Sequence, residues 1–297
     1  MGTKTTATAA NFPPALVAEM FNTVVGHSTI AKLSGAKPIP FAGETVFTFA
    51  MNGEVSIVGE GDNKPAGDAS FTPKTIRPIK MVYQHRLANE FVYLSEEGRI
   101  PYLQAFADGF AKKMARGLDI AAMHGLNPAD LSDASFKATN SFDGLITNVV
   151  TYAAANVDAN IDAAIQMVTG GERVVNGLGI SPAAGAALAA IKVNGVPQYP
   201  EFRFGQNPDA FYGMKSDVNN TVNKTGTAAG SVTDQVIVGD FENAFRWGYA
   251  KDIPLEVIEY GDPDGQGDLK RTNEVVLRAE AFVGWGILDA ASFAAVR

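Results

Sequence analysis

Residues 59–77 read GEGDNKPAGDASFTPKTIR, and this stretch decides how the chain is organised. It is rich in glycine, proline and charged residues, yet it lies between two runs with the alternating pattern of β-strands, at 44–58 and 75–94. Glycine-rich loops cradle phosphate or cations in some proteins, so the stretch either holds a ligand or is itself held by another subunit. Two strands joined by a long polar loop form an extended hairpin, which is only marginally stable alone in water. We therefore expect this hairpin to be mobile or to be pinned by a neighbour.

The segment before the hairpin, residues 1–40, has a polar start followed by apolar residues. Residues 15–25 predict a short helix after two prolines, and the alternate prolines of residues 37–40 favour an extended chain. The segment has too few apolar residues to form a core of its own. We expect it to be an arm that lies across another part of the structure.

The clearest helix is predicted at residues 95–125. Ser95 provides an N-cap, and Glu96 and Glu97 place acidic side chains in the first turn. An apolar stripe at helical spacing follows, made of Ile100, Leu103, Phe106, Phe110, Met114, Leu118 and Ala121. At about 1.5 Å per residue the helix would be roughly 30–40 Å long, so it is expected to support a flat domain.

The middle of the chain mixes short helices with brief strands. A helix is predicted at 158–169, and another from Pro182 with Ser181 as its N-cap. From Gln235 the sequence becomes strand-like, in runs at 235–250, 252–260 and 273–288, and it ends in a terminal strand. The predicted fold class is α+β.

The composition excludes several classes of protein. The 297 residues are 46% hydrophobic and 19% charged, which is enough for a sizeable core. The formal net charge is −8 without a clustered basic surface, so specific nucleic-acid binding is not indicated. There are no cysteines, which excludes disulfides, thiolate metal sites and cysteine nucleophiles. No window approaches the roughly 18 apolar residues of a membrane span, and no signal peptide is recognisable, so a cytoplasmic protein without membrane contact is expected.

No motif predicts an active site or a cofactor. The glycine-rich segments lack the lysine of a phosphate-binding loop and the third glycine of a dinucleotide fingerprint. The three histidines, His27, His85 and His124, lie far apart in unrelated elements, and none has an acidic or histidine neighbour at metal-ligand spacing. We interpret them as ordinary packing or surface residues.

The segment GDPDGQGDLKR at 261–271 has two interpretations. Asp262, Asp264 and Asp268 partly resemble a calcium-binding loop, but Gln266 and Asn273 stand where such a loop needs acidic ligands. The flanking elements are strands, so a hairpin tip with Asp and Gly turn residues is favoured. A cation bound by the three aspartates is the alternative.

The order of these elements resembles the tailed-bacteriophage major capsid proteins of the Hong Kong 97-like fold. The GEGDNKP loop leads into a strand with Lys80 at a position that is typically lysine in that family. Four further segments resemble family motifs: GLGISPAAGAALAAIKVNGVPQYP at 177–200, FYGMKSDVNNTV at 211–222, VIVGDFENAFRWGYAKDIPLEV at 236–257 and VVLRAEAFVGWGILDAASFAAV at 275–296. The resemblance of each segment alone is weak. Together the segments cover the chain from about Phe12 onward and follow one another in the same order as in the family.

The resemblance implies an architecture. Residues 1–40 would be the N-terminal arm and 41–84 the extended loop that overlaps an adjacent subunit. The peripheral domain would comprise 85–132 and 235–283, with the long helix as its spine, and the axial domain 133–234 and 284–297.

The resemblance also implies a function. The chain would self-assemble into the hexamers and pentamers of an icosahedral phage head, built in the host cytoplasm, that encloses a double-stranded DNA genome. Expected partners are a portal protein, a scaffolding protein and, in some heads, a decoration protein. No long charged segment precedes the arm, so we expect the scaffold to be either a separate protein, which the start at Met1 favours, or a segment that is removed.

Some members of the family cross-link their subunits by an isopeptide bond between a loop lysine and an asparagine of a neighbour, assisted by a glutamate. By this resemblance Lys64 is the lysine, and Asn273 and Glu280, seven residues apart, are the asparagine and the glutamate. Glu280 would take the ammonium proton so that the amine attacks the carboxamide. A lysine beside a proline at a loop tip is usually solvated or paired with an acid, so simple contact remains the alternative.

Two other classes stay open. An encapsulin-like nanocompartment shell shares the fold but encloses enzyme cargo, and packaged DNA or a portal would distinguish a phage head from it. An enzyme would need a site hidden in the axial domain, and a purified chain that stays a small monomer would favour it.

Overall fold

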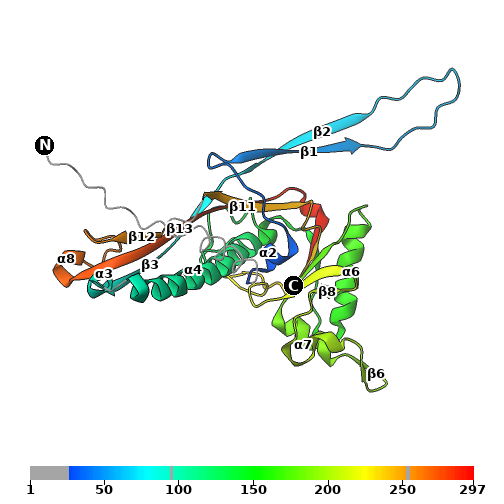
Figure 1. Ribbon diagram of the computed structural model, residues 1–297. Helices are drawn as coiled ribbons and strands as arrows, with labels where there is room; N and C mark the ends of the chain where they lie inside the picture. The colour runs from blue at the N-terminus through cyan, green and yellow to red at the C-terminus, as the bar shows by residue number, and fades with distance from the viewer. Residues whose placement is uncertain (1–26, 94–95, 252–254) are drawn as a thin grey trace.

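The computed structural model describes residues 27–93, 96–251 and 255–297 (Figure 1). The helix predicted at 15–25 and the N-cap predicted at Ser95 lie outside these residues. Two separate β-sheets, a projecting hairpin and a small two-stranded ribbon organise the described chain. The observed class is α+β, as the sequence predicts. Among the described helices, none is both long and apolar enough to cross a membrane.

A four-stranded antiparallel sheet is built around β13 (Glu274–Ile287). One edge of β13 pairs with β3 (Ile79–Ala88), and the other pairs with β11 (Phe245–Lys251) and β12 (Leu255–Ile258). The long helix α4 (Glu96–His124) runs along this sheet (Figure 1) and confirms the helix predicted at 95–125.

The spacing of apolar residues in α4 and in β13 explains why the helix packs on this sheet. Successive side chains of a strand point to opposite faces, whereas a helix repeats every 3.6 residues, so each can present one apolar face. Every second residue at the end of β13 enters the shared core: Ala279, Ala281, Val283, Trp285 and Ile287. The helix contributes Ala107, Phe110, Ala111, Met114, Ala115 and Leu118. Burying a large apolar side chain contributes about 1.5–3 kcal/mol, so this core holds α4 in place.

The second sheet has six strands in the order β4-β14-β10-β5-β9-β8. Their bounds are Asn148–Val150, Phe293–Val296, Val236–Gly239, Gly177–Ile180, Met214–Val218 and Ala210–Phe211. Val236 and Val238 face a core shared with α6 (Val157–Thr169) and α7 (Pro182–Ala190), whereas Ile237 between them faces the core of α4. The sheet is therefore apolar on both faces.

Both short helices predicted for the middle of the chain are confirmed. The helix α6 covers the range predicted at 158–169, and α7 begins at Pro182. The Ser181 hydroxyl accepts a hydrogen bond from the backbone N–H of Ala184 at 3.1 Å, which is the expected N-cap.

The remaining elements are short. They are the helices α2 (Thr29–Leu33), α3 (Glu90–Tyr93), α5 (Phe142–Leu145) and α8 (Leu269–Thr272), the 3₁₀ turns η1 (Ala154–Asn156), η2 (Pro200–Gly205) and η3 (Ala290–Ser292), and the ribbon of β6 (Lys192–Val193) and β7 (Val196–Pro197).

The predicted hairpin exists, but its second strand was placed wrongly. β1 (Glu44–Asn52) pairs in register with β2 (Asp68–Ile76), which the sequence interpretation had treated as loop. The alternating run that begins near Thr75 is largely β3, and it pairs over ten residues with β13 instead. Its alternation has a physical reason, since Ile79 and Met81 pack against the core of α4. Most of β2 is exposed and shows no such pattern.

The described part of the arm lies on its own subunit. The N–H of Lys37 donates to the carbonyl of Trp247 at 2.9 Å, and the N–H of Ile39 donates to that of Tyr249 at 3.1 Å, so the arm extends along β11. A side chain at Gly248 would collide with the backbone of Lys37, so only glycine permits this close approach.

The observed sheets do not follow the domain limits that the resemblance implies at every point. The strand β3 begins within 41–84, the range expected for the extended loop, but it belongs to the four-stranded sheet. The strand β10 lies within 235–283, but it is a central strand of the six-stranded sheet.

Candidate functional site

The β1–β2 hairpin projects from the body of the subunit (Figure 1). Its large apolar side chains are open to solvent: Phe47 is 66% exposed, Phe49 55%, Met51 76% and Phe71 69%. The loop that joins the strands adds Val55 and Ile57, which are also exposed. Soluble monomers rarely expose a contiguous apolar surface of this kind, so the hairpin is suited to packing on a partner.

The base of the hairpin is anchored. Ile76 is completely buried against Gly284 and Gly286, where an added Cβ would come within 3.4 Å of it. Arg246 also pairs with Glu44 at the start of β1, with Nη2 and Oε2 2.8 Å apart. The hairpin is therefore held at its root and free along its length.

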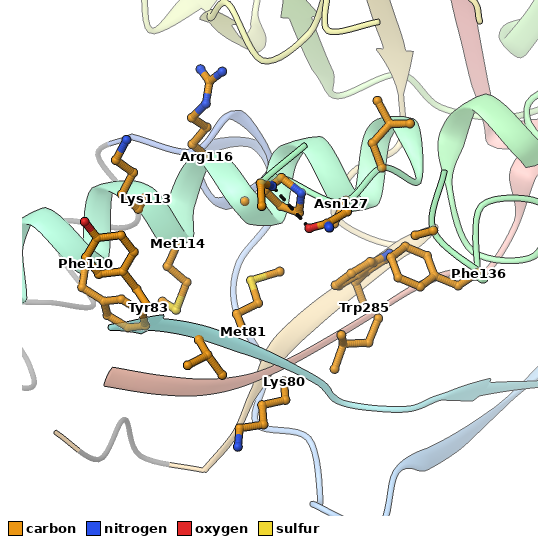
Figure 2. A pocket seen from close by; sticks show the side chains of 18 residues that line it. Lys80, Met81, Tyr83, Phe110, Lys113, Met114, Arg116, Asn127, Phe136 and Trp285 are labelled. Carbon is orange, nitrogen blue, oxygen red and sulfur yellow. Dashed lines mark hydrogen bonds between the residues drawn. The ribbon is translucent and has the colours of Figure 1, made fainter. Parts of the chain in front are cut away.

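A groove of about 560 Å³ lies between β3, α4 and the segment that follows α4. Figure 2 shows Met81 and Met114 pointing toward each other across it, with Phe136 and Trp285 at one end. The rings of Phe136 and Trp285 meet edge to face with centroids 5.4 Å apart. Lys80, Lys113 and Arg116 also line the groove, and no acidic residue is among its lining residues. Figure 2 shows the charged ends of these three side chains pointing away from Met81 and Met114, so the interior of the groove is apolar.

The three residues of the expected cross-link do not meet within one subunit. Lys64 is exposed in the loop between β1 and β2. Asn273 is the C-cap of α8, in the left-handed conformation at φ 58° and ψ 48°, and its side-chain oxygen accepts from Asn89 Nδ2 at 3.3 Å. Glu280 lies seven positions further along the chain in β13, a span of about 23 Å at 3.3 Å per residue. Any reaction among the three must use more than one copy of the chain.

Glu280 has a partner in the subunit. Its Oε1 lies 2.7 Å from Nζ of Lys80, which is two residues along β3 from Val82, the register partner of Glu280. The carboxylate is 20% exposed and the lysine 48%, so the pair lies at the surface of the sheet. A second lysine would have to compete with Lys80 for this carboxylate.

The acidic segment at 261–271 surrounds an arginine that the sequence interpretation did not consider. Arg86 Nε donates to Asp264 Oδ2 at 2.8 Å, and its Nη1 donates to Glu274 Oε2 at 2.8 Å. The hydrogen bond from Arg86 lowers the pKa of Asp264 to about 2. Asp262 lies 3.5 Å from the same guanidinium, and Asp268 caps α8 by accepting from the N–H groups of two residues. The structure favours the hairpin-tip interpretation over a cation loop.

A buried carboxylate connects α2 to the rest of the subunit. Asp119 in α4 accepts hydrogen bonds from Ser28 Oγ at 2.6 Å, from the N–H of Thr29 at 2.9 Å and of Ile30 at 3.1 Å, and from Thr221 Oγ1 at 2.7 Å. Burial raises the pKa of Asp119 to about 6, against the opposing effect of these hydrogen bonds. No sequence pattern indicated this network, because its members lie about 90 or more residues apart.

One group of ligand-type atoms among the described residues lies within 4.8 Å: those of His124, Asp143 and Asp234. We do not interpret it as a metal site. Arg297 already pairs with Asp234 at 2.7 Å, and both ring nitrogens of His124 already have partners. The sequence interpretation missed this cluster, because it treated His124 as an ordinary packing residue.

Comparison with known proteins decides the family. The model of the phage capsid family matches residues 10–297. The chain belongs to the phage capsid family. Among solved structures, this capsid protein is similar to a chain from Mycobacterium phage Ogopogo, with 33% identity and a TM-score of 0.79 over 91% of this chain and 92% of that one. A chain from Gordonia phage Cozz has 26% identity and a TM-score of 0.74 over 91% and 86%.

More distant structures share the fold alone. The capsid of a native GTA particle is 13% identical, with a TM-score of 0.62 over 92% of this chain and 89% of that one. No curated protein matches the sequence. The family match confirms the resemblance to phage capsid proteins and places the chain among structural proteins of the virion shell, in a family that is not an enzyme family.

Proposed function

We propose that this capsid protein is the major subunit of a tailed-phage head, in which hexamers and pentamers form an icosahedral shell around double-stranded DNA. The observation that carries the proposal is the hairpin, which exposes Phe47, Phe49 and Phe71 but is anchored at its base. An element of this kind gains stability when a neighbouring copy covers it. The family match supports assembly with itself.

In this proposal each of the two sheets would belong to a different domain of the capsid subunit. The four-stranded sheet with α4 as its spine would form the peripheral domain, and the six-stranded sheet with α6 and α7 would form the axial domain around the five-fold and six-fold axes. The β1–β2 hairpin would be the extended loop, and residues 1–40 would be the arm. The tip at 261–271 would meet other capsomers.

We place the hairpin of one copy over the groove of the next. The groove is apolar, as is the exposed stem of the hairpin. Contact between the two apolar surfaces would remove both from water.

Electron microscopy of the purified full chain tests the proposal. Shells, tubes or separate capsomers are expected. A chain that stays a monomer at every concentration contradicts assembly, and a shell that contains enzyme cargo and no nucleic acid favours a nanocompartment. Particles from infected cells should also contain a portal and, during assembly in the host cytoplasm, a scaffolding protein.

Cross-linking is a further part of the proposal. The Lys64 amine of one copy would attack the side-chain carbonyl of Asn273 in another, forming an N–C bond and releasing ammonia. Glu280, contributed by a copy placed beside that bond, would accept the ammonium proton after exchanging its contact with Lys80. Denaturing gels of assembled particles test this: a ladder that disappears in Lys64→Arg supports it. A single band near 31.3 kDa from assembled wild-type particles refutes it while leaving assembly intact.

A further inference from the structure

Four charged side chains are buried together where the end of α4 meets the six-stranded sheet. His124 is the last residue of α4, Asp143 lies in α5, Asp234 precedes β10 and Arg297 follows β14. The side chains of His124 and Asp234 are completely buried, and those of Asp143 and Arg297 are 5% and 16% exposed. These four residues are called the junction cluster below.

The hydrogen bonds of His124 require an additional proton. Nε2 lies 2.9 Å from the carbonyl oxygen of Thr221, which can only accept, so Nε2 carries a hydrogen. Nδ1 lies 3.1 Å from Oδ2 of Asp143. A carboxylate oxygen also only accepts, so without a further proton two lone pairs would face each other in a buried site. The pair therefore holds one proton more than a neutral imidazole and a carboxylate.

The charge balance leads to the same conclusion. Arg297 Nε donates to Asp234 Oδ1 at 2.7 Å, and its Nη2 lies 3.7 Å from Asp143 Oδ1. With a neutral imidazole, two carboxylates and one guanidinium leave a net charge of −1 in the interior. The other carboxylate oxygens, Asp143 Oδ1 and Asp234 Oδ2, are buried without a hydrogen-bond donor among the described residues. One additional proton makes the cluster neutral.

The pKa directions agree with this geometry. Burial lowers the pKa of His124, but the hydrogen bond and charge of Asp143, with the charge of Asp234, outweigh it and the net pKa is raised. Burial raises the pKa of Asp234, and Asp143 raises it further, against the opposing charge of Arg297. A raised pKa in the folded chain means stability that is complete below the ordinary pKa and lost as the pH rises through the folded one.

We propose that the junction cluster is a proton-operated latch: the proton between Nδ1 of His124 and Oδ2 of Asp143 fastens the end of α4 to α5 and to the six-stranded sheet. The charged groups that face His124 are Asp143 from α5 and Asp234 from the segment before β10, and Arg297 faces the same carboxylates from the end of β14. Loss of the proton leaves an uncompensated negative charge and only one N–H on the imidazole, which cannot serve both acceptors. If that hydrogen moves to Nδ1 to face the Asp143 carboxylate, Nε2 presents a lone pair to the Thr221 carbonyl and the Thr221 segment is released. The stability of the contact between the end of α4 and the six-stranded sheet therefore depends on pH.

Exchange of the imidazole C2 hydrogen for deuterium, followed by mass spectrometry of the full chain across a pH series, tests the protonation directly. The method reports each histidine separately, so the exposed His27 and His85 serve as references in the same sample. His124 is expected to titrate above about 6.5, the ordinary value for histidine. Titration of His124 below that value overturns the proposal, as does a divalent cation bound in stoichiometric amount.

The variant Asp143→Asn should lower the pKa of His124, because it removes the carboxylate whose hydrogen bond and charge raise it. The matched control is Glu242→Gln, which removes a carboxylate from an exposed pair with Lys215 and should leave His124 unchanged. An unchanged His124 titration in Asp143→Asn overturns the proposal.

Amide exchange of the wild-type chain keeps the test decisive if Asp143→Asn does not fold. After correction for base catalysis, residues 219–224 and 140–146 should exchange at least tenfold faster above the titration of His124 than below it, while the α6 segment stays constant. An equal change in amide exchange rate across these segments and α6 overturns the proposal.

Discussion

Replacing Phe49 and Phe71 by serine should block assembly while leaving the subunit folded. The two residues face each other in the β1–β2 register, with ring centroids 4.8 Å apart. They remain 55% and 69% exposed, so most of their apolar surface contributes nothing to the isolated subunit. In the proposed shell a neighbour covers that surface.

The size of the effect follows from the exposed fractions. Complete burial of a phenylalanine contributes about 1.5–3 kcal/mol, so covering the exposed half to two thirds contributes about 1–2 kcal/mol for each ring. The pair then contributes about 2–4 kcal/mol to each hairpin contact, which corresponds to a roughly 30- to 900-fold change in its association constant. A shell repeats this contact around every capsomer, so the loss should abolish closed particles.

Sedimentation velocity and electron microscopy would follow assembly, and circular dichroism would follow the fold. The double variant Phe49→Leu and Phe71→Leu is the matched control, because it keeps apolar side chains at both positions and should assemble. Normal particles from the serine variant would refute the account of the hairpin, and unfolding of its subunit would show that the rings stabilise the monomer instead.

Three further predictions concern the subunit itself. Gly248→Ala should detach the arm from β11, with loss of two backbone hydrogen bonds at about 1 kcal/mol each, and amide exchange of the arm should rise; Gly35→Ala, where a methyl group meets nothing, should have no effect. Because burial raises the pKa of Asp119 to about 6, its contribution to the free energy of unfolding is present below about pH 4 and lost as the pH rises through 6, so calorimetry should show the wild-type midpoint falling over that range more steeply than in Asp119→Asn. A midpoint difference that does not change with pH would contradict this assignment. Arg86→Met should make the tip at 261–271 sensitive to limited proteolysis, while Lys270→Met, which removes a lysine that lies over the ring of Tyr260, should not.

The sequence predicted the elements that carry their own local signals. The stripe of α4 and the Ser181 cap of α7 are local patterns that tertiary packing reinforces, and both helices were located correctly. The strand β2 was missed because its side chains are mostly exposed, so selection for a buried face left no alternation to read. The strand β3 alternates clearly, but alternation does not specify a partner, and the nearest strand was wrongly assumed.

The polar sites could not be predicted for a different reason. Asp119 is surrounded by donors from residues 28–30 and from Thr221, and His124 meets its partners from α5 and from the Thr221 carbonyl. These contacts exist only after the chain has folded, and no spacing rule connects positions so far apart. The cross-link expected for Lys64, Asn273 and Glu280 joins different copies of the chain, so it stays a prediction that the structure of one subunit does not test.

The most direct test of the central claim is the mass of the purified full chain in solution, measured by mass photometry over a range of concentrations and paired with electron microscopy. The account predicts capsomers of five and six subunits, or larger shells, that disappear when Phe49 and Phe71 are replaced by serine. A particle that stays at 31.3 kDa at every concentration would contradict it.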